Sequence, residues 1–227
     1  MFPSYPTLVE AKKMCCPPDS SITITNISAK VNLQDLLDHT VARILIIDSV
    51  YENSLRKLKL FCKWGCDESA GQSEYKQVLP EESDVISDAN LFIASLVPIR
   101  LIDETTNTVV WMNETCSSVR YCRPVLLEFA KETPEKTAFV VAVINNQKQN
   151  LSPSLINKNG EVNEITHDLF LTMIDGKVAQ VLTKTRSSAS CTVCGATPQQ
   201  MNNLEAVSTR DVNEFFRINL ALQTLQV

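Results

Sequence analysis

The nearly continuous apolar run Asn90–Ile102 limits the folds open to this chain more than any other feature of the sequence. A run of this kind is typical of a strand that is buried on both faces of a sheet. The turn-forming residues Glu104–Asn107 follow it, and they lead into a second apolar segment, Val109–Met112. We expect these two segments to pair as a hairpin. The sequence therefore predicts a sheet that is covered by other elements.

A second strand is predicted from Lys57 to Asp67, where apolar and basic residues alternate with a period of two. The apolar positions are Leu58, Leu60, Cys62, Trp64 and Cys66, and the basic positions are Lys57, Lys59 and Lys63. We expect this strand to stop at Asp67. Gly71, with serines on both sides, indicates a loop after it.

Helices are predicted both before and after these strands along the sequence. Pro6–Cys15 is the first, with Thr7 and Glu10 spaced as a capping box. Asn32 is expected to cap the second, whose apolar residues fall on one stripe: Leu33, Leu36, Leu37, Val41, Ile44 and Leu45. Thr133-Pro134 is a favourable start for a third helix that runs to about Gln147. A fourth is expected to begin near Val178.

The remaining segments are strand-like, and they define the expected architecture. Ser20–Val31 is extended, Val125–Phe129 is a short strand, and Thr166–Ile174 is a strand that ends at Asp175-Gly176. The main order is then four strands, a helix and a further strand. This order predicts an α/β fold with a mixed sheet and flanking helices. With 227 residues, 44% of them hydrophobic, one main domain is expected.

The composition bears on partners and compartment. The net charge is −5 and the sequence pI is about 5.2, whereas a domain that holds DNA alone usually has a basic excess. Any DNA contact must therefore rest on a local site. The sequence has no signal-peptide pattern and no long unbroken apolar run, so we expect an intracellular, soluble protein whose cysteines are free thiols or metal ligands.

Three carboxylates lie at or just after predicted strands and are candidates for chemistry: Asp67, Glu132 and Asp175. If the strand ends converge on one edge of the sheet, the carboxylates could hold two Mg²⁺ ions about 4 Å apart for phosphodiester chemistry. Each residue also has a structural explanation. Asp175-Gly176 is a common turn signal, Glu132 suits a helix N-terminus, and Asp67 could simply end a strand.

Two of the eight cysteines have the spacing of zinc ligands, Cys191 and Cys194. A structural zinc ion needs four ligands, so this pair is half of a site, and no second pair follows it. The two histidines, His39 and His167, do not form a spaced pair. The other cysteines are expected to be small buried apolar residues.

Taken together, several segments resemble the catalytic core of Transib-type transposases, the family that includes the V(D)J recombination-activating protein. Lys63–Ser69 is similar to the family's first Asp segment, Tyr121–Thr133 to a Glu segment, and Leu171–Lys177 to the second Asp strand. Cys191–Pro198 resembles the start of the zinc-binding insertion. Tyr5–Lys13 and Leu33–Thr40 match the lead-in, so the likeness follows chain order over nearly the whole sequence.

The resemblance implies an RNase H-like fold that depends on Mg²⁺ or Mn²⁺. It also implies DNA nicking at transposon ends, hairpin formation and strand transfer by a dimeric assembly in the nucleus. Asp67, Glu132 and Asp175 would be the metal ligands, and Cys191 and Cys194 would be half of a Zn²⁺ site. The implied domains are a helical lead-in over 1–52, the RNase H-like core over 53–188, and the start of the insertion over 189–227.

Two departures from the family pattern shape the functional expectation. Glu68 follows the first Asp, where the family usually has a small Gly, and the chain ends at Val227, before the family's late catalytic Glu and zinc-binding His pair. We therefore expect the isolated chain to be inactive and to bind DNA weakly. The alternatives are a domesticated, non-catalytic interaction protein that pairs with an intact transposase, and a degenerate fragment without function.

Overall fold

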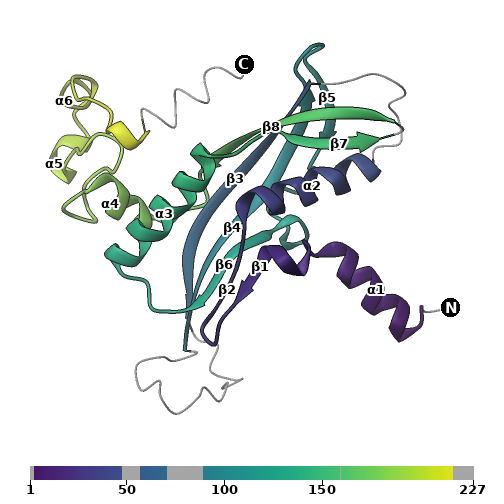
Figure 1. The fold of residues 1–227 in the computed structure, drawn as a ribbon. Coiled ribbons are helices and arrows are strands. Elements are labelled where there is room, and N and C mark those ends of the chain that lie inside the picture. The colour runs from purple at the N-terminus through teal and green to yellow at the C-terminus, as the bar shows by residue number, and fades with distance from the viewer. Residues whose placement is uncertain (1–2, 48–56, 71–88, 159, 217–227) are drawn as a thin grey trace.

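The computed structural model describes residues 3–47, 57–70, 89–158 and 160–216. Its strands form one sheet, with β5 (Thr108–Met112) paired to β4 beside the main path (Figure 1). Along that path the order is β1 (Ile22–Ile24), β2 (Ser28–Val31), β6 (Arg123–Phe129), β4 (Asn90–Asp103), β3 (Lys57–Ala70), β8 (Glu161–Leu171) and β7 (Ser154–Lys158). The helices are α1 (Tyr5–Cys15), α2 (Leu33–Ile47), α3 (Pro134–Gln149), α4 (Gly176–Thr183), α5 (Pro198–Met201) and α6 (Leu204–Ser208), with short 3₁₀ turns at Asp19–Ser21 and Val119–Tyr121.

The directions of the central strands decide where their ends lie. β4 is antiparallel to both β3 and β6, and β3 is parallel to β8. β3, β6 and β8 therefore run in the same direction, and their C-terminal ends point to the same edge of the sheet, although β8 ends beside Trp64 and β3 continues to Ala70. The mixed α/β sheet with flanking helices agrees with the fold class predicted from the sequence.

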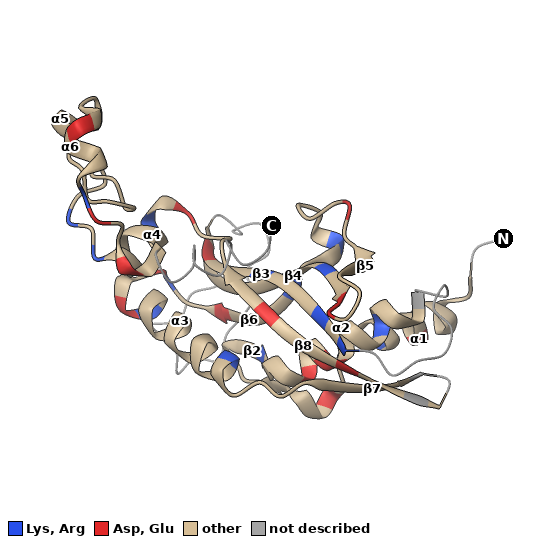
Figure 2. Cartoon of the chain, turned by 90° about the horizontal axis from the view of Figure 1, so that it is seen from above, with Lys and Arg blue, Asp and Glu red and all other residues tan. Residues whose placement is uncertain are grey.

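One face of the sheet carries the main core. Leu58, Leu60, Cys62, Trp64 and Cys66 are all buried, as the alternation along Lys57–Asp67 predicts. α2 and α3 cover this face in both views (Figures 1 and 2). The predicted α2 stripe is buried throughout: Leu33, Leu36, Leu37, Val41, Ile44 and Leu45. The spacing of apolar residues gives each helix and each strand one apolar face, and these faces pack against each other in the core.

The opposite face of the sheet is held by an aromatic contact rather than by a long helix. The rings of Phe61 and Phe170 stack with centroids 6.3 Å apart, and the Arg100 guanidinium lies 4.8 Å from the centre of the Phe61 ring. Phe61 belongs to β3 and Phe170 to β8, so the contact reinforces the parallel strand pair.

Several predicted boundaries differ from the structure. β3 does not stop at Asp67, because Asp67–Ala70 continue to pair with β4. The cap of α1 is Ser4 rather than Thr7, so the predicted Thr7/Glu10 capping box does not form. β8 ends at Leu171, earlier than Ile174, and β7 was not predicted. The loop expected at Gly71 lies outside the described residues.

The peripheral helices are less buried than α2 and α3. α1 contains no buried residue and extends away from the sheet, and α5 and α6 lie beyond α4 at the other side of the molecule (Figure 1). Within the described ranges, no helix is both long and apolar enough to cross a membrane.

Candidate functional site at the ends of β3, β6 and β8

The edge where β3, β6 and β8 end carries a group of charged residues, which we call the carboxylate edge: Asp67, Glu68, Glu132, Asp175 and Lys177. Asp67 and Glu68 lie near the end of β3, Glu132 follows β6, and Asp175 and Lys177 lie where the chain passes from β8 into α4. The charges of Asp67, Glu132 and Asp175 all reach Cys66. Together with burial, which is the larger cause, they raise the pKa of that thiol to about 12.

Glu132 is the buried centre of the carboxylate edge. Its side chain is 4% exposed, and its Oε2 accepts a hydrogen bond from Lys177 Nζ at 2.6 Å. Its backbone N–H donates to Glu68 Oε2 at 2.7 Å, and Thr137 Oγ1 donates to its Oε1 at 3.5 Å. A carboxylate as buried as this needs a cationic partner, and Lys177 is that partner.

Lys177 reaches this buried carboxylate from solvent, since its own side chain is 57% exposed. The hydrogen bond that Lys177 donates to Glu132, followed by the charges of Glu132, Glu68 and Asp175, raises the pKa of Lys177. Three carboxylates therefore act on one ammonium group. The carboxylate edge therefore contains a positive charge, that of Lys177, although the candidate site residues identified from the sequence were all acidic.

Asp175 has a defined structural role at the start of α4. It is the N-cap residue, and its Oδ1 accepts a hydrogen bond from Val178 N–H at 2.7 Å. This is the helix-start role that an Asp-Gly pair permits, because the cap satisfies a free N–H of the first turn. Asp175 therefore has a structural role, although it starts a helix rather than the turn that the Asp-Gly pair indicates.

Gly65 allows the segment before Asp175 to pass close to β3. Thr172 and Met173 both donate backbone hydrogen bonds to Trp64 O, at 3.1 and 3.0 Å. A Cβ atom at position 65 would lie 1.7 Å from Met173 O, so only glycine fits there. This close approach sets the path of the chain from β8 to Asp175.

Asp67 shares the edge but not the immediate contacts of Glu132. Alternation along β3 directs Asp67 to the face opposite Cys66 and Glu68, and its side chain is exposed. Its Oδ1 accepts a hydrogen bond from Glu68 N–H at 2.8 Å. The structure thus brings Glu68, rather than Asp67, against Glu132. Sequence reasoning noted Glu68 only as a departure from the family pattern.

The carboxylates do not form a ready-made metal site in the described part of the chain. No group of three or more His, Cys, Asp or Glu side chains there has an arrangement that could hold a metal ion. The reasons lie in the contacts above: Lys177 binds Glu132, Asp175 caps α4, and Asp67 lies on the other face of β3.

Cys191 and Cys194 lie together in a tight loop after α4. Cys191 N–H donates to Ala196 O at 2.9 Å and Gly195 N–H to Cys191 O at 2.8 Å, with Gly195 at φ +68°. Hydrogen bonding lowers the pKa of the Cys191 thiol, chiefly through the backbone of Cys194. Arg210 Nε donates to Cys194 O at 2.9 Å, which ties the loop to the segment after α6.

The loop brings its two thiols together, yet two thiols are only half of a zinc ligand set. Within residues 3–216, gaps aside, the metal-binding residue types supply no complete set around this loop. The half site predicted from the sequence therefore stays a prediction.

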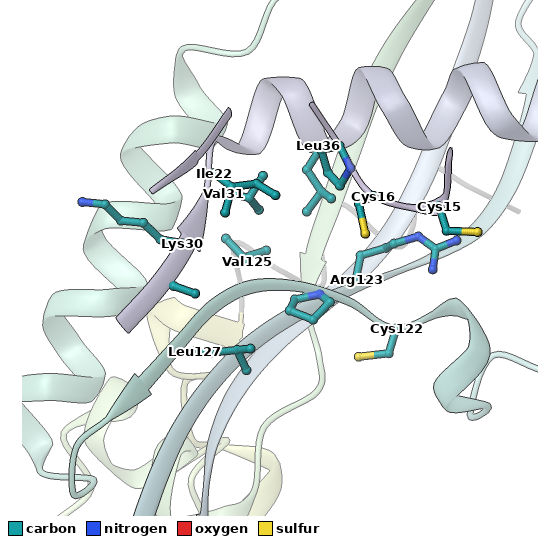
Figure 3. Close-up of a pocket in the computed structure, with 13 residues that line it drawn as sticks. Cys15, Cys16, Ile22, Lys30, Val31, Leu36, Cys122, Arg123, Val125 and Leu127 are labelled. Carbon is teal, nitrogen blue, oxygen red and sulfur yellow. The ribbon is translucent and has the colours of Figure 1, made fainter. Parts of the chain in front are cut away.

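A separate pocket of about 310 Å³ lies between the end of α1, β2 and the first half of β6 (Figure 3). Its walls are mainly apolar and include the thiols of Cys15, Cys16 and Cys122. Arg123 also lines it, and its buried Nε has no hydrogen-bond partner within the described part of the chain. The pocket contains none of the carboxylates, and the sequence did not indicate it because its walls come from segments far apart in the chain.

Charges elsewhere are mixed. Figure 2 shows Lys and Arg interspersed with Asp and Glu over the sheet and the helices. Two further ion pairs in the described ranges, Lys59 with Glu104 at 2.7 Å and Lys136 with Glu128 at 2.5 Å, join residues of opposite sign on the surface. This pattern agrees with the net acidic composition.

The sequence matches no protein-family model, and no curated protein matches it.

Proposed function

We propose that this chain is an RNase H-like domain of transposase ancestry, of the DNA-recombinase class. The observation that carries the proposal is the common direction of β3, β6 and β8, which brings the segments bearing Asp67, Glu132 and Asp175 to one edge of the sheet. These are the three carboxylates that the resemblance to Transib-type transposases implies as catalytic. By the same resemblance we propose a nuclear location, transposon-end DNA as the partner, and a dimer.

The family's Mg²⁺ or Mn²⁺ would supply activation of the attacking and leaving oxygens of a phosphodiester. The residues of this chain do not fit those ions as they stand, because Lys177 holds the buried Glu132 and Asp175 caps α4. We therefore propose that the chain by itself does not cut DNA. Zn²⁺ would bind Cys191 and Cys194 firmly only with ligands from elsewhere.

A second candidate is a domesticated interaction protein that keeps the fold without catalysis. The favouring observation is that two of the three predicted metal ligands make ordinary structural bonds, one in an ion pair and one at a helix cap. Under this proposal, replacing Asp67 changes neither stability nor partner binding, because among the described residues the exposed Asp67 side chain bonds only the adjacent backbone at Glu68.

The test is a cleavage assay of the purified chain and its Asp67→Ala variant on labelled duplex DNA and on supercoiled plasmid, first in Mg²⁺ and then in Mn²⁺. We expect both proteins to leave the DNA intact. DNA binding should also be weak even at low salt, because a chain with net charge −5 gains little from counterion release.

Cleavage by the native chain that disappears in Asp67→Ala would contradict the proposed inactivity and would establish a working nuclease site. Cleavage that persists in the variant would indicate a contaminating nuclease. The two proteins are purified in parallel and assayed together, so that cleavage by the chain is distinguished from cleavage by a contaminant.

A further inference from the structure

We infer that Lys177 is a built-in counter-cation of the carboxylate edge, which stands in for a divalent metal ion and lowers the affinity of this edge for one. The inference rests on the proposed function, because the proposed function is what implies a metal ion there. It goes beyond that function by giving Lys177 a role that limits metal binding.

The Lys177 ammonium lies where a metal ion would have to bind Glu132. Nζ lies 2.6 Å from Glu132 Oε2, and the charges of Glu68 and Asp175 act on it as well. A carboxylate oxygen that binds an ammonium at this distance cannot bind a metal ion in the same direction, since both cations use the same lone pairs. Lys177 and a divalent ion therefore compete for Glu132.

The burial of Glu132 favours Lys177 over a metal ion in this competition. The Glu132 side chain is 4% exposed, so loss of its only cationic partner among the described residues would leave a buried, unpaired charge. A metal ion must therefore displace Lys177 before it can bind Glu132. The ammonium is tethered two residues beyond the Asp175 cap, so it is always present at high effective concentration.

Glu68 strengthens the arrangement. Its Oε2 accepts the Glu132 backbone N–H at 2.7 Å, which places a second carboxylate beside the first. Two neighbouring carboxylates repel each other unless a cation lies nearby, and Lys177 provides that cation. The ammonium thus binds Glu132, and the charges of Glu68 and Asp175 also act on it.

The experiment compares Mn²⁺ binding by the native chain and by Lys177→Met, with free Mn²⁺ measured by electron paramagnetic resonance. We expect Lys177→Met to bind Mn²⁺ about tenfold or more tightly than the native chain, by analogy with the effect of a close opposite charge on carboxylate proton affinity. Lys177→Gln, which can still donate a hydrogen bond to Glu132, should bind with similar strength to Lys177→Met.

Lys131→Met is the matched control. Lys131 is an exposed lysine next to Glu132 and takes part in none of the ion pairs found in the described ranges, so the variant changes the net charge equally. Its Mn²⁺ affinity should stay within about twofold of the native value, because exposed charges act weakly at a distance. Equal tightening in both variants would overturn the inference in favour of a general charge effect.

Thermal unfolding gives a second readout for a variant that folds less well. Lys177→Met should unfold at a lower temperature than the native chain, since Glu132 is left unpaired, and saturating Mn²⁺ should raise its Tm more than that of the native chain. A Tm that does not respond to Mn²⁺ would count against the inference even if the variant is only partly folded.

The Asp67→Asn variant separates this inference from the proposed function. Tight binding by Lys177→Met, together with native binding that weakens in Asp67→Asn, would support both. If Lys177→Met binds like the native chain while Asp67→Asn loses binding, the inference fails and the proposed function stands. If Lys177→Met binds tightly and Asp67→Asn has no effect, the inference stands and the proposed ligand set fails. Absence of Mn²⁺ binding in every variant would overturn the inference.

Discussion

At the scale of single residues, Gly65 is the position where the path to the candidate site is most sharply constrained. The chain that leaves β8 passes so close that a methyl group at position 65 would lie 1.7 Å from Met173 O. The next acidic residue on that path is Asp175. A change at Gly65 should therefore affect both stability and the placement of this carboxylate.

We expect Gly65→Ala to lower the free energy of unfolding by about 1–3 kcal/mol or more, because backbone atoms must move to admit the methyl group. Gly176→Ala is the control: it lies at the first position of α4, and a methyl group there meets nothing within 4 Å. This control should be neutral or stabilising by about 0.5–1 kcal/mol. Urea unfolding of the two variants decides, and equal stabilities would contradict the proposed close approach.

Between elements, a buried polar network joins α2, β7 and β8. Ser154 Oγ on β7 donates to Asp38 on α2 and lies 2.7 Å from His167 Nε2 on β8. Because the single hydroxyl proton goes to Asp38, the hydroxyl oxygen accepts from His167 Nε2–H. His167 Nδ1 is then the nitrogen without a proton, and it is buried without a hydrogen-bond partner among the residues that the structure describes.

This arrangement predicts a loss of stability at acidic pH. Burial lowers the pKa of His167 from 6.5 to about 4, although Asp38 opposes the shift. The unfolded chain therefore binds a proton at a higher pH than the folded chain does. The free energy of unfolding should keep its full value above pH 6.5. It should fall by up to about 3 kcal/mol as the pH drops from 6.5 to about 4.

Urea unfolding of the native chain and His167→Gln at pH 7.5 and pH 4.5 measures this effect. Gln can still donate to Ser154 but cannot be protonated, so the variant should lose less stability between the two pH values. Equal losses in both proteins would show that other groups cause the acid sensitivity.

The same elements show why sequence predicted some parts of the structure and not others. Asn32 caps α2 through its own side chain, accepting from Gln34 N–H at 2.9 Å, so the residues that set this boundary are neighbours in sequence. The burial of Leu58 through Cys66 likewise follows from period-two alternation. β7 has no such signal, because Ser154–Lys158 becomes a strand only by pairing with β8.

The candidate site also has features that the sequence predicted and contacts that it did not. Strand-end positions predicted that Asp67, Glu132 and Asp175 belong to segments at one edge, and the strand directions agree. The contact of Glu68 with Glu132 joins residues 64 positions apart, and the pairing of Lys177 with Glu132 joins residues 45 apart. No local pattern encodes either contact, so the cation at the carboxylate edge emerged only from the three-dimensional arrangement.

At the scale of the whole molecule, an acidic α/β domain carries the carboxylate edge, in which Lys177 neutralises the buried Glu132. The net charge of −5 gives the domain little general attraction for DNA, so any recombinase activity depends on this edge and on partners that supply positive charge. The apolar pocket between the end of α1, β2 and β6 is a separate feature, since none of the carboxylates lines it. By our inference, Lys177 occupies the cation site of the carboxylate edge.

The most direct test is the crystal structure of Lys177→Met soaked in Mn²⁺, with data collected at a wavelength where manganese scatters anomalously. We predict an anomalous peak in contact with carboxylate oxygens of Glu132 and Asp175, close to the place of the Lys177 ammonium in the native chain. Crystals of the native chain under the same soak should show a much weaker peak there. Native crystals with an equally strong peak, or variant crystals with no peak at the carboxylate edge, would contradict the account.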